Sequence, residues 1–298
     1  MLCKNYCLQF LDATTSSTRN YTQNIKNHKE IFAPKFKEPH FFNFDKNFSK
    51  GIEWYKQTYY SNVYDEKAII DFTPTYLYSN SCAERIFKSL GPQMKFIVIL
   101  RDPVNRAYSH YNHSVRDGHE ENSFLEAIDL ESKRIKQFEK NDDFLSELRC
   151  SYISQGMYFK MLKSYLKYYD ISDFLIINFD EEVAQNMNQT ISRLSNFLNI
   201  DLSDLDFNIH SNKSGKSKNK SIQYLINKDN FLRKIFRFFV PQVSRQIIRN
   251  KIKNFNKTEF NYKLITDKQR NMLFEKYFND DIKKLEELVG KKMNWNNL

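Results

Sequence analysis

The sequence predicts an α/β fold, a single domain with a central parallel sheet flanked by helices. Segments typical of strands alternate with segments typical of helices, which is the order that builds parallel sheets through right-handed crossovers. Residues 96–100 form a continuous apolar run rich in β-branched side chains, as expected for a strand buried on both faces. The chain of 298 residues is 41% hydrophobic, enough for a sizeable core, and no repeat or domain boundary interrupts it. We therefore predict one domain, residues 1–298.

The N-terminal half begins with a predicted strand at 3–11, a Ser/Thr-rich loop at 12–19 and a short helix at 21–28. A loop at 32–44 contains Pro34 and Pro39, and a helix is predicted at 51–60. The next strand, 68–72, ends at Thr73 and Pro74. A helix at 81–90, the apolar strand 96–100 and a helix at 104–116 complete this half, because each follows the periodicity of its class.

The C-terminal half begins with a turn at 117–121. A mostly helical, charged segment at 123–147 and an amphipathic helix at 151–169 follow, then a strand at 174–178, a helix at 187–198 and a polar loop at 201–220. A basic helical segment at 222–252 is interrupted by Pro241. The last helix has Thr266 at its start with Gln269 three residues on, and Gly290 closes it, which are ordinary start and stop signals.

The net charge is +10, which favours polyanionic partners: nucleic acid, an anionic membrane surface, a phosphorylated cofactor or a sulfated glycan. A solvated basic surface is the alternative, and composition alone favours it. No nucleic-acid-binding motif accompanies the charge, so nucleic acid is not an expected partner. No apolar run approaches the roughly 20 residues of a membrane span.

The four cysteines show no pairing at metal-site spacing, and no signal segment is apparent. We expect ordinary thiols, a reducing compartment and a cytoplasmic location. His110, His113 and His119 lack carboxylates at metal-site spacing, so no metal is expected. Ser214–Ser217 resembles the end of a nucleotide-binding P-loop, but His210 stands where that motif needs glycine, and we reject the motif.

Arg101 and Asp102 follow the predicted strand 96–100 at its carboxyl end, where open α/β sheets bind ligands. Arg101, with Ser109 two helical turns later, could grip one anionic group. The alternative is that Arg101 and Asp102 form an ion pair. Glu38 and His40, two residues apart in a loop, could serve a hydroxyl or amine nucleophile, although by itself the segment is better interpreted as an ordinary charged loop. The loop at 12–19 is either a phosphate cradle or a turn that caps a helix.

The string FIVILRDPVNRAYSHY at 96–111 resembles the 3′-phosphate-binding strand and helix of sulfotransferases that use 3′-phosphoadenylyl sulfate (PAPS), especially the heparan-sulfate type and its bacterial cousins. Further counterparts lie at 30–42, 51–55 (GIEWY), 71–76 (DFTPTY), 156–158, 197–200 (FLNI) and near Trp295. The resemblance implies a P-loop-like sulfotransferase fold. It also implies transfer of a sulfuryl group from PAPS to a hydroxyl or amine by in-line displacement, with a carbohydrate as the leading acceptor.

The resemblance also implies roles for individual residues. Glu38 would be the general base with His40 assisting, and Arg101 and Ser109 would hold the 3′-phosphate. The 5′-phosphosulfate would lie in the loop at 12–19, and the other implied cofactor contacts are Tyr158, Lys216 and Lys218. The residues of that loop are Thr15, Ser16, Ser17, Thr18 and Arg19.

The chain departs from the pattern of its relatives at several of these positions. Thr15 stands where a lysine is expected, Ser17 replaces glycine and Arg19 replaces threonine. Phe72 stands where some relatives have lysine, and Asn43 where they often have aspartate. Because a cation facing the leaving phosphate stabilises the transition state, an alternative function is a degenerate relative that binds nucleotide or acidic glycan without turnover. The acceptor and the oligomeric state are not predicted.

Overall fold

A computed structural model describes residues 25, 27–35, 38–205 and 265–295, and the backbone alone of Tyr6–Asp12, Gly215–Ser217 and Lys257–Glu259. The chain divides into two compact units. The first unit contains Met1–Ala107, Ile153–His210 and Asp267–Leu298, and the second contains Tyr108–Tyr152 and Ser211–Thr266. The predicted loop at 12–19 and the predicted helices at 21–28 and 222–252 lie largely outside the described residues.

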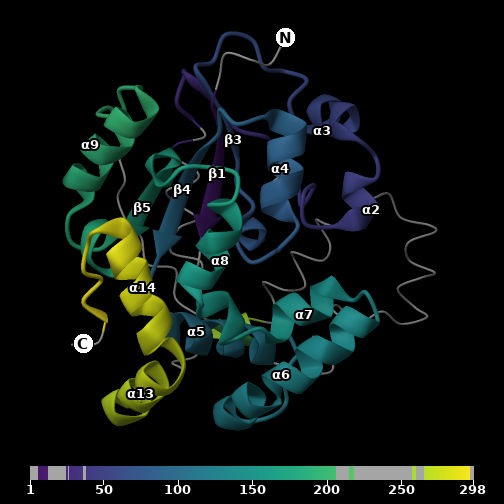
Figure 1. Ribbon diagram of the computed structural model, residues 1–298, viewed down its shortest axis with the longest axis vertical. Coiled ribbons are helices and arrows are strands. Elements are labelled where there is room, and N and C mark those ends of the chain that lie inside the picture. Colours follow the sequence, from purple (N-terminus) through teal and green to yellow (C-terminus); the bar gives the residue numbers. More distant parts are fainter. Residues whose placement is uncertain are drawn as a thin grey trace. The chain divides into compact units, whose positions relative to one another are not determined.

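The first unit is built on a five-stranded sheet in the order β2-β3-β1-β4-β5, drawn in Figure 1. All four strand pairs are parallel, which confirms the predicted fold class. The strands are β1 (Tyr6–Asp12), β2 (Ile31–Phe32), β3 (Ala68–Asp71), β4 (Lys95–Leu100) and β5 (Phe174–Asn178). The prediction of a loop from residue 32 was wrong at its start, because β2 is only two residues long and leaves no periodic signal.

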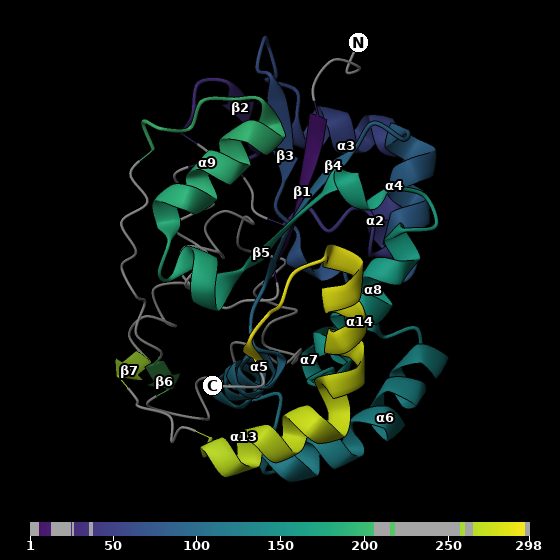
Figure 2. The same cartoon turned by 60° about the vertical axis from the view of Figure 1, so that its left-hand side comes forward.

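Helices cover both faces of this sheet, as Figures 1 and 2 show. On one face Ile97 and Ile99 share a core with Leu194 of α9 (Met187–Leu198). On the other face Phe96 packs against Tyr165 of α8 (Tyr158–Tyr165), with ring centroids 5.3 Å apart. Neighbouring residues of β4 thus serve opposite layers, since side chains alternate along a strand. Burial on both faces explains why the strand is apolar throughout.

The remaining helices of the first unit surround this framework. They are α2 (Asp45–Phe48), α3 (Ile52–Tyr59), α4 (Cys82–Leu90), α13 (Asp267–Leu273) and α14 (Asn279–Val289). Short helical turns occupy Pro74–Tyr76, Ser154–Gly156, Ile171–Asp173, Phe179–Val183 and Phe274–Phe278. Within the described part of the chain, no helix has the length and apolar character needed to cross a membrane.

The helix predicted at 151–169 is shorter than expected, because the chain makes a separate turn at Ser154–Gly156 before α8. Gly156 lies where a Cβ would come within 2.7 Å of the Phe278 ring, so this turn packs tightly against the C-terminal layer. Asp281 of α14 accepts hydrogen bonds from the backbone N–H groups of Phe159 and Lys160, at 2.8 and 3.0 Å. These bonds satisfy donors that the first turn of α8 leaves free.

The second unit contains α6 (Phe124–Lys140), α7 (Phe144–Cys150) and the antiparallel pair β6 (Gly215–Ser217) and β7 (Lys257–Glu259). Helix α5 (Pro103–Arg116) begins in the first unit and ends in the second. The mostly helical segment predicted at 123–147 consists of two helices, because Asp142 has a positive φ of 53° and Asp143 caps a new helix. The strand β6 likewise lies within the loop predicted at 201–220.

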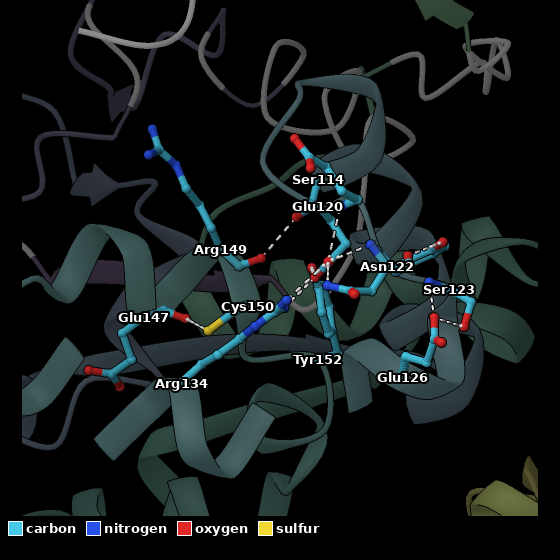
Figure 3. A network of polar contacts seen from close by, with 12 residues as sticks. Ser114, Glu120, Asn122, Ser123, Glu126, Arg134, Glu147, Arg149, Cys150 and Tyr152 are labelled. Carbon is cyan, nitrogen blue, oxygen red and sulfur yellow. Dashed lines mark hydrogen bonds and ion pairs between the residues drawn. The ribbon is translucent and has the colours of Figure 1, made fainter. Parts of the chain in front are cut away.

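A polar network centred on Glu120 holds the loop between α5 and α6 (Figure 3). Its carboxylate accepts hydrogen bonds from Arg134, from the backbone and side chain of Asn122, and from the Tyr152 hydroxyl. Burial opposes the charge, but the hydrogen bonds from Arg134 and Asn122 outweigh it and lower the pKa of Glu120 to about 2. The network is internal to the second unit and serves its stability.

Candidate active site

Glu38 and His40 lie in the loop between β2 and α2, and both have left-handed backbone conformations. Their φ angles are 55° and 51°, in a region that costs a residue with a side chain about 1–2 kcal/mol. Three hydrogen bonds fix the following turn: Phe41 N–H donates to the Tyr76 hydroxyl, Asn47 donates to the His40 carbonyl and Arg85 donates to the Phe42 carbonyl. The surrounding structure therefore holds this loop in a conformation that it would not adopt alone.

The His40 ring lies between a carboxylate and an amide. Its Nε2 is 3.4 Å from Glu38 Oε2, and its Nδ1 is 3.2 Å from Asn43 Nδ2 and 3.3 Å from Thr75 Oγ1. The Glu38 side chain is 47% exposed and that of His40 is 28% exposed. The structure therefore brings the two predicted catalytic residues together and leaves the carboxylate open to solvent.

A buried carboxylate, Asp71, lies at the end of β3 and is linked to this loop through Tyr76. It is fully buried, and it accepts hydrogen bonds from the hydroxyls of Tyr55 at 2.7 Å, Thr73 at 2.6 Å and Tyr76 at 3.1 Å. Burial raises the pKa of Asp71, and these three hydroxyls oppose the shift. Because the Tyr76 oxygen also accepts the Phe41 N–H at 2.9 Å, Asp71 and Tyr76 anchor the loop of Glu38 and His40 to the sheet.

The sequence analysis assigned no role to Asp71, Tyr55, Tyr76 or Thr75. The signal that could have found them is an aspartate at the carboxyl end of a buried strand, followed at once by threonines and a tyrosine. A buried carboxylate needs hydrogen-bond donors, and hydroxyl side chains nearby in the sequence are candidates for that purpose.

A second polar centre lies at the end of β4. Asp102 is fully buried and forms an ion pair with Arg270 of α13. Its Oδ1 also accepts the Asn105 N–H at 2.6 Å, which caps the start of α5. Its own backbone N–H donates to Asp180 at 2.8 Å. The structure thus rejects an Arg101–Asp102 ion pair, because Arg270 is the partner of Asp102.

Arg101 itself has no hydrogen bond or ion pair to its guanidinium from any residue that the structure describes, and its Nε is buried without an acceptor. Its backbone is fixed, since the hydroxyl of the buried Tyr158 donates to the Arg101 carbonyl at 2.9 Å. Burial raises the pKa of this tyrosine. Tyr158, which the resemblance implied as a cofactor contact, here contacts the backbone of Arg101.

The other predicted site residues are less fully described. Ser109 is half-buried on α5, in the part that belongs to the second unit. Lys216 lies in β6, where only the backbone is described, opposite Thr258 of β7. Outside the described residues lie Thr15, Ser16, Ser17, Thr18, Arg19 and Lys218. In the described part of the chain, no group of His, Cys, Asp and Glu residues has the geometry of a metal site.

Comparisons with known proteins point to one family. A family model described as "Sulfotransferase domain" matches residues 9–293. Heparan sulfate glucosamine 3-O-sulfotransferase 5 of Mus musculus is 29% identical over 179 residues, which are 59% of this chain and 48% of that protein. The bifunctional heparan sulfate N-deacetylase/N-sulfotransferase 1 of Caenorhabditis elegans is 29% identical over 146 residues, which are 49% of this chain and 16% of that protein. The chain spans half or less of the length of these curated relatives.

Among solved structures, a sulfotransferase from Alicyclobacillus acidocaldarius matches with a TM-score of 0.65 at 22% sequence identity. The match covers 97% of each chain. At this level of identity the comparison shows that the two proteins share a fold.

Proposed function

The chain belongs to the sulfotransferase domain family, and from this membership we propose that it transfers a sulfuryl group from PAPS to a hydroxyl or amine on a carbohydrate acceptor. Membership confirms the predicted family, the predicted enzyme class and, with the parallel sheet, the predicted fold. The donor, the acceptor and the residue roles are the proposal. Two features of the first unit support it.

The first feature is the edge of the sheet at which Arg101 lies. In the order β2-β3-β1-β4-β5, β2 and β3 lie on one side of β1, while β4 and β5 lie on the other. Open α/β sheets bind ligands beside such a switch point between β1 and β4, at the carboxyl ends of the strands. Arg101 follows β4 directly, and Asp12 at the end of β1 pairs in register with Ile99. The guanidinium of Arg101, which has no partner among the described residues, therefore suits the 3′-phosphate of PAPS. The loop Thr15–Arg19, which follows β1, suits the 5′-phosphosulfate.

The second feature carries the catalytic part of the proposal: a strained loop presents the exposed Glu38 carboxylate against His40. Thr75, which contacts the His40 ring, follows β3. Because β3 and β4 both pair in parallel with β1, their carboxyl ends lie at the same edge of the sheet. Thr75 and Arg101 follow these two ends in the sequence. This arrangement supports a site in which Glu38, the proposed base, and Arg101, which is proposed to bind the 3′-phosphate, act at the same edge of the sheet.

In the proposed reaction Glu38 takes the proton of the acceptor hydroxyl or amine as the acceptor atom attacks sulfur. A bond forms between the acceptor atom and sulfur while the bond from sulfur to the 5′-phosphate oxygen breaks. The leaving adenosine 3′,5′-bisphosphate keeps that electron pair. His40 holds the carboxylate in place through its Nε2, and Arg101 keeps the nucleotide in line.

Removing the base tests the proposed chemistry. Glu38→Gln should lower transfer of labelled sulfate from PAPS to a panel of glycans by about 10²–10⁴-fold, the usual contribution of a general base. The panel should contain free hydroxyl and free amine acceptors, because the two curated relatives are named for O- and N-sulfation. Glu53→Gln is the matched control, because the Glu53 side chain on α3 is 72% exposed. This variant should transfer sulfate normally. Full activity of Glu38→Gln would contradict the assignment.

Removing the guanidinium tests donor binding separately. Arg101→Gln should elute early from immobilised adenosine 3′,5′-bisphosphate, while Arg116→Gln, an arginine already paired with Asp117, should be retained like the native chain. Unchanged retention of folded Arg101→Gln would remove the basis of the donor site. Retention of the native chain without transfer to any acceptor would favour the alternative, a relative that binds nucleotide without turnover.

A further inference from the structure

The surroundings of His40 determine which ring nitrogen carries its proton. The Nε2 nitrogen lies 3.4 Å from Glu38 Oε2, so a proton on this nitrogen faces a group that can only accept. An amide nitrogen can only donate, so the nitrogen 3.2 Å from Asn43 Nδ2, Nδ1, must offer its lone pair. We propose that Asn43 is a positioning residue that holds His40 as the neutral Nε2–H tautomer, so that Glu38 rather than His40 takes the proton of the acceptor.

The orientation of the Asn43 amide supports this assignment. Its nitrogen donates to Thr75 Oγ1 at 2.9 Å as well as to His40 Nδ1, so both amide hydrogens have acceptors. Its Oδ1 is buried and has no donor among the described residues. In the reverse orientation the buried NH₂ group would leave two hydrogens without acceptors, which costs more than one unpaired carbonyl oxygen. Asn43 is 5% exposed, so water cannot readily satisfy that group.

Thr75 strengthens the same assignment. Because its oxygen accepts from Asn43, its own hydrogen is available for His40 Nδ1 at 3.3 Å. Two donors then converge on Nδ1, which disfavours a proton on that nitrogen. Asn43 and Thr75 therefore act together on one side of the ring, while Glu38 acts on the other.

The consequence for the reaction rests on the proposed function. A neutral imidazole places its N–H 3.4 Å from Glu38 Oε2 and adds no positive charge beside the base. An aspartate at position 43 would instead accept from Nδ1–H and stabilise the imidazolium ion. A cation beside Glu38 would make that carboxylate a weaker base, so an asparagine favours proton abstraction by Glu38 near neutral pH.

The other charged groups around His40 must be considered in any pH measurement. Glu38 faces the ring from the same loop, and Asp71 faces it from β3, since a charge on His40 lowers the pKa of that carboxyl. Arg85 of α4 and Asp45 of α2 flank the loop and pair with each other. Asn43→Asp adds a third carboxylate to Glu38 and Asp71, and this carboxylate would face His40 Nδ1 as an acceptor in place of a donor.

Nitrogen NMR of the full chain with ¹⁵N-labelled histidine tests this inference, because protonated and unprotonated ring nitrogens have well-separated shifts. The chain has six histidines, and His40→Gln identifies the His40 signals by their loss. In slightly alkaline buffer the native chain should show Nε2 protonated and Nδ1 unprotonated. In Asn43→Asp the Nδ1 nitrogen should be protonated in the same buffer, because the new carboxylate can only accept a hydrogen bond from it.

Asn47→Asp is the matched control. It places the same new charge in the same loop region, but Asn47 contacts the His40 carbonyl rather than the ring, so the Nε2–H tautomer should persist. A native His40 with Nδ1 protonated would overturn the inference, even if Asn43→Asp did not fold. Conversion of the ring in Asn47→Asp as in Asn43→Asp would overturn it too. Because the spectra need no donor or acceptor, failure of sulfuryl transfer would contradict the proposed function and leave this inference standing.

Discussion

Tyr76 is the hydroxyl that joins the buried carboxylate Asp71 to the loop of Glu38 and His40, so Tyr76→Phe should damage both stability and catalysis. The substitution removes the acceptor of the Phe41 N–H, whose residue is fully buried. An unpaired buried N–H costs about 1–3 kcal/mol, and the lost donor to Asp71 adds about 1 kcal/mol. We expect a loss of about 2–4 kcal/mol in the free energy of unfolding, measured by urea titration.

The catalytic effect follows from the strain in the loop. Glu38 and His40 hold left-handed conformations at about 1–2 kcal/mol each, and without the Tyr76 anchor the loop can relax toward ordinary backbone angles. If about 1.4–2 kcal/mol of that strain is released, kcat falls about 10- to 30-fold. The assay is transfer of labelled sulfate from PAPS, with kcat and KM determined separately. KM for PAPS should change little, because the hydrogen bonds of Tyr76 join it to the Phe41–Phe42 turn, Asp71 and Tyr165 rather than to Arg101.

Tyr55→Phe is the matched control for this experiment. It removes a hydroxyl that donates to the same carboxylate oxygen, Asp71 Oδ2, at 2.7 Å, and it leaves the Phe41 N–H paired with Tyr76. Its stability should fall by about 1–2 kcal/mol, with a clearly smaller loss of kcat than in Tyr76→Phe. Equal losses of kcat in the two variants would refute the claim that Tyr76 acts by anchoring the loop.

Two further predictions concern stability. Arg270→Met should cost about 3–5 kcal/mol, because it leaves the fully buried Asp102 without its cationic partner. The double variant with Asp102→Asn should recover part of that loss in urea titrations, and a single variant as stable as the native chain would contradict the role of the pair. The second prediction concerns acid unfolding. Hydrogen bonds from Arg134 and Asn122 outweigh burial and lower the pKa of Glu120 to about 2, so its contribution is complete above the usual pKa of about 4.5 and is lost as the pH falls toward 2. Since Arg134 is partly exposed, solvent screening reduces this contribution to about 2 kcal/mol. Glu120→Gln should flatten the pH dependence measured by circular dichroism in urea, whereas parallel acid transitions in variant and native chain would count against it.

Local patterns in the sequence were sufficient to predict four of the five strands of the sheet, all except β2. β4 and β5 are short apolar runs buried on both faces, and this property depends on the run itself. The errors occurred where packing decides between similar local patterns. The turn before α8, for example, depends on how Gly156 fits against Phe278, a contact between residues far apart in the chain. The break between α6 and α7 depends on a positive φ at Asp142, a conformation that aspartate adopts more readily than most residues do.

The candidate site shows the same division. Arg101 could be placed from the sequence because the end of a buried strand is a local feature with a general meaning. The sequence could not predict that the Arg101 guanidinium is available to a ligand. This depends on Arg270, which pairs with Asp102 from 168 residues away. The Tyr76–Phe41 hydrogen bond joins residues 35 apart, and no periodicity marks such a contact. The left-handed backbone conformations of Glu38 and His40 follow from these contacts, so the sequence could not predict them either.

The site thus contains two carboxylates with opposite roles, which their surroundings assign. Asp71 receives three hydroxyl donors and no solvent, so it can hold other groups in place but cannot meet a substrate. Glu38 is 47% exposed and has His40 beside it, so it can exchange a proton. The strain of about 2–4 kcal/mol in the Glu38 loop is similar to what a few anchoring hydrogen bonds of about 1 kcal/mol each supply. Because the margin is small, we expect the buried residues Tyr76 and Asp71 to determine how well the exposed carboxylate is placed.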